Sequence, residues 1–120
     1  MKVYKSNIVD ALRMLADYEL QKATWLHETD VWSSFNDEVE AVFLDSGIEE
    51  MLGQGEVVFG SKADAALKEL LETANSIGYH RNEHELVHTP EMEALRQKAA
   101  YALALIEASD GKESTVEIIE

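Results

Sequence analysis

The segment SKADAALKELLETANSIG, residues 61–78, decides the fold class of this chain. Its apolar residues recur every three or four positions, which is the spacing of the buried face of an α-helix. Ser61 and Asp64 form a capping signal at its start, and Gly78 is typical of a helix end. The segment therefore predicts a long amphipathic helix whose buried stripe consists of Ala63, Ala66, Leu67, Leu70, Leu71, Ala74 and Ile77.

The rest of the chain predicts further helices on the same grounds. Ser6 is a candidate cap for a helix through residue 16, and Asp17 either caps a second helix up to residue 26 or marks a bend in a single one. Ser34 starts a helix along residues 35–43, a short helical turn follows Gly47 at residues 48–52, and Thr89-Pro90-Glu91 starts the last helix, which runs to about Ser109. Residues 57–59 are β-like but too short for a sheet, so we expect a buried loop crossing there.

These patterns predict an all-α fold: a compact bundle of four to five helices with short connections and at most one short extended segment. Residues 1–111 are expected to form a single helical domain, and residues 112–120 a mobile C-terminal tail. The length of 120 residues is ordinary for one domain with its own core.

The charge of the chain is strongly unbalanced. Ten lysines and arginines stand against 24 aspartates and glutamates, which gives a net charge of −14 at pH 7. A surface of that sign disfavours nucleic acid phosphates and anionic membranes as partners. The chain has no cysteine and no apolar run near the ~18 residues of a membrane span. We therefore expect a cytoplasmic protein without a cofactor, a disulfide or a thiolate zinc site.

No lysine or arginine lies between Lys22 and Lys62, although this part of the chain is rich in carboxylates and aromatics. Acidity alone is common in soluble proteins and is explained equally well by solubility. A local acidic surface beside an aromatic anchor, however, suits a basic protein partner. The candidate partner-binding residues are Trp32, Asp37, Glu38, Glu40, Asp45, Glu49 and Glu50.

The sequence His84-Glu85-Leu86-Val87-His88 matches the zinc-peptidase motif H-E-x-x-H. On a helix, His84 and His88 would hold the metal, Glu85 would be the general base, and Glu107 is a possible third ligand. Three features favour a solvated loop instead. The preceding residues are polar, Gly78 and Pro90 leave room for only a short helix, and no strand pattern supplies a substrate-binding edge. No metal site is therefore favoured.

Several short motifs along the chain form a set that resembles the pattern of a known protein family. Residues 11–25 have the pattern A-L-x-x-L-A-D-x-E-x-Q-x-x-x-W, and the later members of the set are Asp45-Ser46-Gly47, Val58-Phe59-Gly60-Ser61, Thr89-Pro90-Glu91, Arg96 and Ala99-Ala100. The set resembles a family of small acidic helical proteins from actinobacteria and other bacteria. The resemblance covers most of the chain and implies a helical fold but no enzymatic activity, and some such genes accompany polymorphic toxins as immunity factors.

The leading hypothesis is a non-enzymatic, immunity-type inhibitor of a basic toxin or effector. The alternatives are a zinc-dependent hydrolase that uses His84, Glu85 and His88, and a helical module with a structural role.

Overall fold

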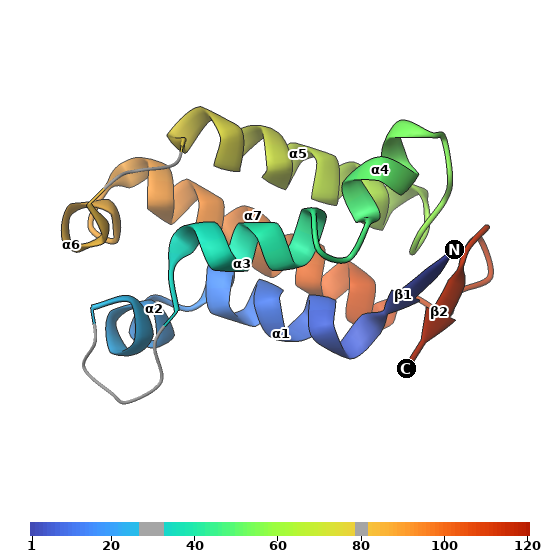
Figure 1. Ribbon diagram of the computed structural model, residues 1–120, viewed down its shortest axis with the longest axis horizontal. Helices are drawn as coiled ribbons and strands as arrows, with labels where there is room; N and C mark the ends of the chain where they lie inside the picture. The colour runs from blue at the N-terminus through green and yellow to red at the C-terminus, as the bar shows by residue number, and fades with distance from the viewer. Residues whose placement is uncertain (27–32, 79–81) are drawn as a thin grey trace.

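The computed structural model describes residues 1–26, 33–78 and 82–120. Along these residues the elements follow in the order β1 (Lys2–Tyr4), α1 (Lys5–Ala16), α2 (Tyr18–Trp25), α3 (Phe35–Phe43), α4 (Ile48–Gly53), α5 (Ser61–Ile77), α6 (Glu83–Leu86), α7 (Pro90–Ala108) and β2 (Glu117–Ile119) (Figure 1). Five of these helices have eight or more residues, and α4 and α6 are shorter. The predicted all-α bundle is confirmed. No helix in the described ranges is long and apolar enough to cross a membrane.

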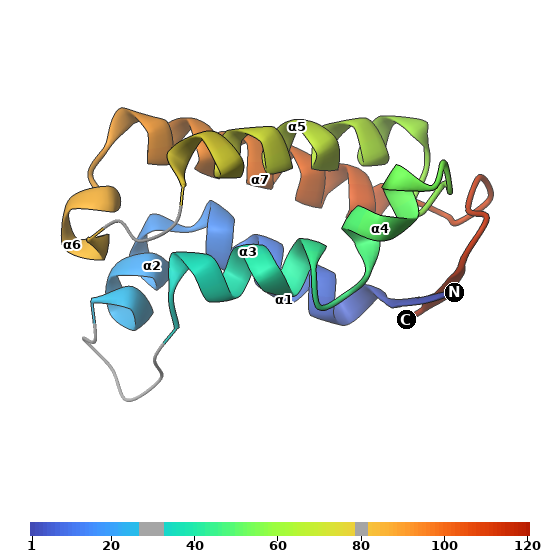
Figure 2. The ribbon, with the colours of Figure 1, turned by 45° about the horizontal axis from the view of Figure 1, so that its top comes forward.

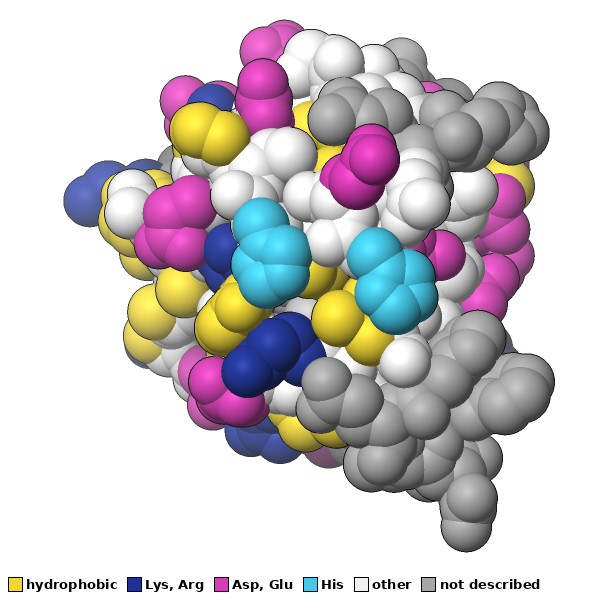
Figure 3. Space-filling view, turned by 90° about the vertical axis from the view of Figure 1, so that its left-hand side faces the viewer, with side chains coloured by type: hydrophobic (Ala, Val, Ile, Leu, Met, Phe, Trp, Pro, Cys, Tyr) yellow, Lys and Arg dark blue, Asp and Glu magenta, His cyan; other side chains and the backbone are white. Residues whose placement is uncertain are grey.

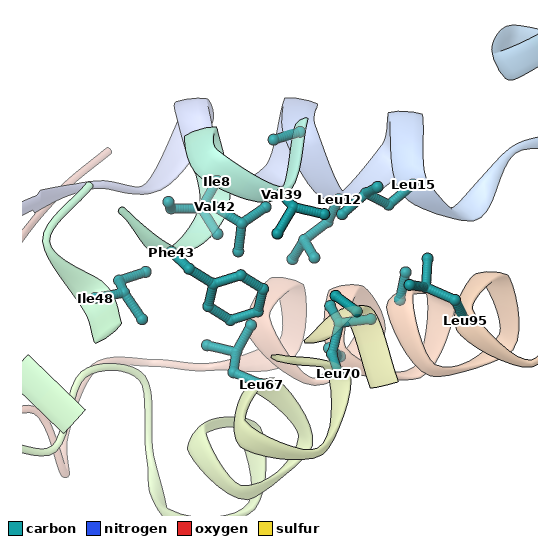
Figure 4. Packing of buried hydrophobic residues seen from close by; sticks show 14 of the residues in the cluster. Ile8, Leu12, Leu15, Val39, Val42, Phe43, Ile48, Leu67, Leu70 and Leu95 are labelled. Atoms are coloured by element: carbon teal, nitrogen blue, oxygen red, sulfur yellow. The ribbon is translucent and has the colours of Figure 1, made fainter. Parts of the chain in front are cut away.

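The four longest helices pack in two layers. Helices α1 and α3 lie side by side in one layer, and α5 and α7 form the other, with α1 against α7 (Figures 1 and 2). The space between the layers is filled by aliphatic side chains around the Phe43 ring, among them Leu12, Leu67 and Leu70 (Figure 4). These four side chains are at most 2% exposed, so the stripe predicted for residues 61–78 does face the core.

Three of the predicted helix starts are confirmed by their capping hydrogen bonds. The side-chain oxygens of Asp17, Ser34 and Thr89 each accept the backbone N–H three residues later, at 3.1, 3.0 and 3.2 Å. Asp17 is extended, with φ −114° and ψ 108°, so residues 5–25 form two helices and not one bent helix. These caps depend on local sequence alone, which is why the sequence locates them.

Two other predicted caps are wrong. Helix α1 begins at Lys5, ahead of Ser6, and no side chain caps it. Ser61 is the first residue of α5 and not its cap. Asp64 is buried, and its carboxylate accepts the backbone N–H groups of residues 58 and 59 at 2.8 and 3.0 Å. Because those residues form the predicted buried crossing, their amides need an acceptor out of contact with water, and Asp64 supplies it.

The C-terminal segment, predicted to be a mobile tail, contains the short strand β2. β2 pairs in parallel with β1, with Val3 opposite Ile118. Ser114 Oγ donates to the Val58 carbonyl at 2.5 Å, and the Thr115 N–H donates to the Val57 carbonyl at 2.7 Å. The tail is therefore held by the carbonyl groups of a loop and by the N-terminal strand, and neither partner is visible in the local sequence of residues 112–120.

Candidate protein-binding surface

The exposed side of α3 and α4 brings five of the predicted carboxylates onto neighbouring elements. Phe35, Val39, Val42 and Phe43 face the core from α3, and Ile48, Met51 and Leu52 do so from α4. Asp37 and Glu40 of α3 and Glu49 and Glu50 of α4 lie on the opposite, exposed side of their helices, as helical periodicity requires. Gly47, with a left-handed φ of 80°, joins the two helices. We call the resulting exposed set the acidic surface: Asp37, Glu40, Asp45, Glu49 and Glu50.

The carboxylates of the acidic surface have no basic partner among the residues that the structure describes. Within the described residues, none of them forms an ion pair with a lysine or arginine, and Glu50 accepts only a hydrogen bond from the Gln54 amide at 3.3 Å. Elsewhere the described residues form seven ion pairs. Like charges on neighbouring exposed positions repel each other, so this surface gains most from an external cation.

Glu38 does not belong to the acidic surface, although the sequence placed it there. Its side chain is half-buried, and Ser33 Oγ donates a 2.5 Å hydrogen bond to it. Burial raises the pKa of the Glu38 carboxyl, and the neighbouring charge of Asp37 raises it further, while the hydrogen bond from Ser33 lowers it. Trp32, the predicted anchor, lies outside the described residues. Trp25 is buried in the core and meets the Phe35 ring edge-on, with centroids 6.1 Å apart.

Two exposed apolar side chains beside the acidic surface were not predicted from the sequence. Leu44, at the end of α3, is 63% exposed, and Tyr4, at the end of β1, is 53% exposed. A groove of about 380 Å³ separates β1 from the end of α3 and is lined by Lys2, Tyr4, Asn7, Ala41, Asp45 and Ser46. Leu44 directly follows the last buried position of α3, so the sequence pattern alone places it at the boundary between core and solvent.

The histidine motif lies at the end of the bundle that carries α2 and α6, far from the groove beside β1 (Figures 1 and 3). Helix α6 has only four residues, and His88 comes after it in a tighter turn in which its N–H donates to the Glu85 carbonyl. His84 and His88 are both exposed, and Tyr18 Oη lies 3.2 Å from His88 Nδ1. Glu107 is near the far end of α7, about 25 Å along the helix from Pro90, and lies 3.8 Å from Arg13.

The structure therefore does not assemble the zinc ligand set of His84, His88 and Glu107. Among the described residues, no group of three or more His, Asp or Glu side chains is arranged to hold a metal ion.

A hollow of about 390 Å³ beside His88 contains a buried guanidinium group. Arg96 Nε donates to Gln21 Oε1 at 2.8 Å, Nη1 to Glu93 at 3.0 Å, and Nη2 to the Val87 carbonyl. Its guanidinium carbon lies 4.9 Å from the centre of the Tyr18 ring. All three nitrogens of Arg96 thus bond to the protein itself, so the group joins α2, α6 and α7 and has a structural role.

No family model, curated protein or solved structure matches this chain. The case for a function therefore depends on the acidic surface and the groove beside it.

Proposed function

We propose that this protein binds a basic protein partner through the acidic surface, and that it acts as an immunity-type inhibitor of a basic toxin or effector. The observation that carries the proposal is that the acidic surface forms no ion pair with any lysine or arginine in the described part of the chain. Asp37, Glu40, Asp45, Glu49 and Glu50 are exposed on α3, on α4 and on the turn between them, and within the described residues no lysine or arginine pairs with them.

Charge and apolar contact contribute differently to such a complex. Complementary charge speeds the encounter and excludes wrong partners, while desolvated apolar side chains slow dissociation. The acidic surface supports the first role. Leu44 and Tyr4 support the second, because both are large, more than half exposed and adjacent to the carboxylates. The combination resembles the anatomy of protein interfaces, in which an apolar centre is surrounded by a polar rim.

The test uses the protein that the neighbouring gene encodes, as the candidate basic partner. This protein is purified with its C-terminal domain included. Association and dissociation rates are measured by surface plasmon resonance at low and high salt. We expect the association rate to fall steeply with salt, and Glu40→Lys/Glu50→Lys to lower it about tenfold or more at low salt.

The matched control is Glu72→Lys/Glu91→Lys. Both of its glutamates are exposed, they lie on α5 and α7, and the double replacement changes the net charge by the same amount. Glu91 also lies in the first turn of its helix, as Glu50 does in α4, so the dipole effects are comparable. Equal losses of association rate in the two double variants would mean that only the overall charge matters. If the protein of the neighbouring gene does not bind the wild-type chain, the inhibitor role is refuted.

A further inference from the structure

The two-stranded sheet is smaller than parallel sheets usually are, and it packs on the core through Val3 on one face. β1 and β2 have three residues each and pair only with each other among the described elements. Parallel sheets are otherwise found in larger assemblies with both faces covered, and two strands alone are marginally stable. A third strand that pairs with β1 or β2 would therefore stabilise this sheet.

Among the described residues, no strand pairs with the edge of β1 that faces away from β2. The N–H of Glu117 donates to the Met1 carbonyl at 3.0 Å, with Lys2 opposite Glu117 and Val3 opposite Ile118. In a parallel ladder, alternate residues direct their N–H and C=O groups to the same neighbour. Met1 and Val3 thus face β2, and the N–H and C=O of Lys2 and the N–H of Tyr4 point to the other edge. The Tyr4 carbonyl is at the start of α1.

The groove described above lies along that open edge. Lys2 and Tyr4 line one side, and Ala41, Asp45 and Ser46 line the other, while no residue of β2 contributes to it. Its far side is the carboxyl end of α3, which has no basic residue in its last turn. The helix dipole and Asp45 therefore both make that side negative.

We infer that the groove accepts an extended segment of the partner as a third strand beside β1, with a lysine or arginine of that segment facing Asp45. This inference rests on the proposed function and specifies the mode of recognition. Backbone hydrogen bonds to Lys2 and Tyr4 supply affinity, and alternate side chains supply selectivity, as in other cases of strand addition. Lys2 has a second effect, since a lysine on a short edge strand discourages pairing with unrelated strands.

The test uses a phage-displayed library of random dodecapeptides, selected against the immobilised full chain. We expect the enriched peptides to carry lysine or arginine and to bind as extended segments. Backbone resonances of Lys2–Tyr4 and of Asp45 and Ser46 should shift in ¹H–¹⁵N spectra when the synthetic peptide is added. N-methylation of the peptide amides that face β1 should weaken binding about tenfold, because each methyl group removes a hydrogen-bond donor.

The matched pair of protein variants is Tyr4→Ala and Tyr4→Pro. Both lose the ring, but only proline lacks the N–H that points into the groove. The Tyr4 backbone, with φ −90° and ψ 102°, is near the conformation of proline. We expect Tyr4→Pro to bind the peptide about tenfold more weakly than Tyr4→Ala. Resonances of residues 117–119 report whether β2 remains paired, and the N-methylated peptides provide the same test on the wild-type chain.

Three outcomes overturn the inference: no enriched peptide, shifts confined to other surfaces, or peptides whose affinity is unchanged by N-methylation. None of these affects the salt and charge-reversal experiment with the intact partner. The two proposals therefore fail separately.

Discussion

Replacing Gln21 with leucine should be among the most damaging single changes in α2. The Gln21 side chain is fully buried, and its amide nitrogen donates to the carbonyls of Met14 and Leu15 at 3.0 and 2.9 Å. Its oxygen accepts Arg96 Nε at 2.8 Å. A neutral hydrogen bond contributes about 1 kcal/mol and one to a charged group about 1.5–3 kcal/mol, so the three together predict a loss of about 3–5 kcal/mol.

Urea unfolding followed by circular dichroism measures this loss. With a slope of about 1.5 kcal/mol per molar urea for a domain of this size, the midpoint should fall by about 2–3 M. The control is Gln97→Leu on α7, because Gln97 is exposed and its side chain forms a single hydrogen bond within the described residues, to Glu93 at 3.5 Å. That variant should stay within about 0.5 kcal/mol of wild type.

A double-mutant cycle with Arg96→Leu separates the bond between the two side chains from their other contacts. The guanidinium is left without its Gln21 partner in the first single variant and is absent in the double variant. Arg96→Leu should therefore cost less stability in the Gln21→Leu background than in the wild-type chain. We expect a coupling energy of about 2 kcal/mol between the two substitutions. Additive losses, or a Gln21→Leu variant as stable as Gln97→Leu, would refute the view that this network fixes α2 against α7.

Further predictions concern the core, the buried carboxylates and the sheet. Phe43→Ala should cost about 3–5 kcal/mol in urea unfolding, because the ring fills the space between the layers. Asp64→Asn should lower stability by about 1–3 kcal/mol, because one of its two oxygens becomes an amide that faces an N–H donor; Asp64→Glu should not restore it if the geometry of the two bonds is what matters. Burial raises the pKa of Glu38, so the folded state retains its proton longer, and stability should fall as pH rises above the ordinary value of 4.5; Glu38→Gln should flatten that slope in unfolding curves recorded from pH 4 upward, and an unchanged slope would contradict the assignment. Ile118→Asp should expose the amides of β2 to hydrogen exchange, whereas Glu117→Asp should leave them protected.

The sequence predicts those parts of the fold that local interactions decide. Asp17, Ser34 and Thr89 cap helices as expected because each acceptor and its donor are three residues apart. Asp64 lies at the same spacing from Ser61, yet its carboxylate is taken by a loop that the bundle buries. An aspartate near the start of a helix can cap that helix or accept hydrogen bonds from a buried loop. The local sequence is the same in both cases, and only the tertiary arrangement decides between them.

The candidate site was predicted in part for a similar reason. Helical spacing places Glu40, Glu49 and Glu50 outward, and the structure agrees. Spacing does not reveal that Ser33 and burial withdraw Glu38 from the surface. The groove at Tyr4 requires the N-terminal strand to lie beside the end of α3, which is a contact between residues about 40 positions apart. Its position depends on how the layers pack and not on any local pattern.

The distribution of basic side chains supports a binding role over one of solubility alone. Because residues 23–61 contain no lysine or arginine, only neighbouring elements could neutralise α3 and α4. Helix α1 packs directly against α3 and carries Lys5 and Arg13, yet Lys5 pairs with Glu120 and Arg13 with Glu107, both at 3.8 Å. Arg13 also pairs with Asp10 of α1 itself, so within the described residues the ion pairs of both cations of α1 are with acids outside α3 and α4. Solubility requires only a net charge and is served equally well by mixed signs over the whole surface. The carboxylates of the acidic surface form no ion pair with a lysine or arginine of the described residues, although the adjacent helix carries such cations, and a partner that supplies its own cations explains this better.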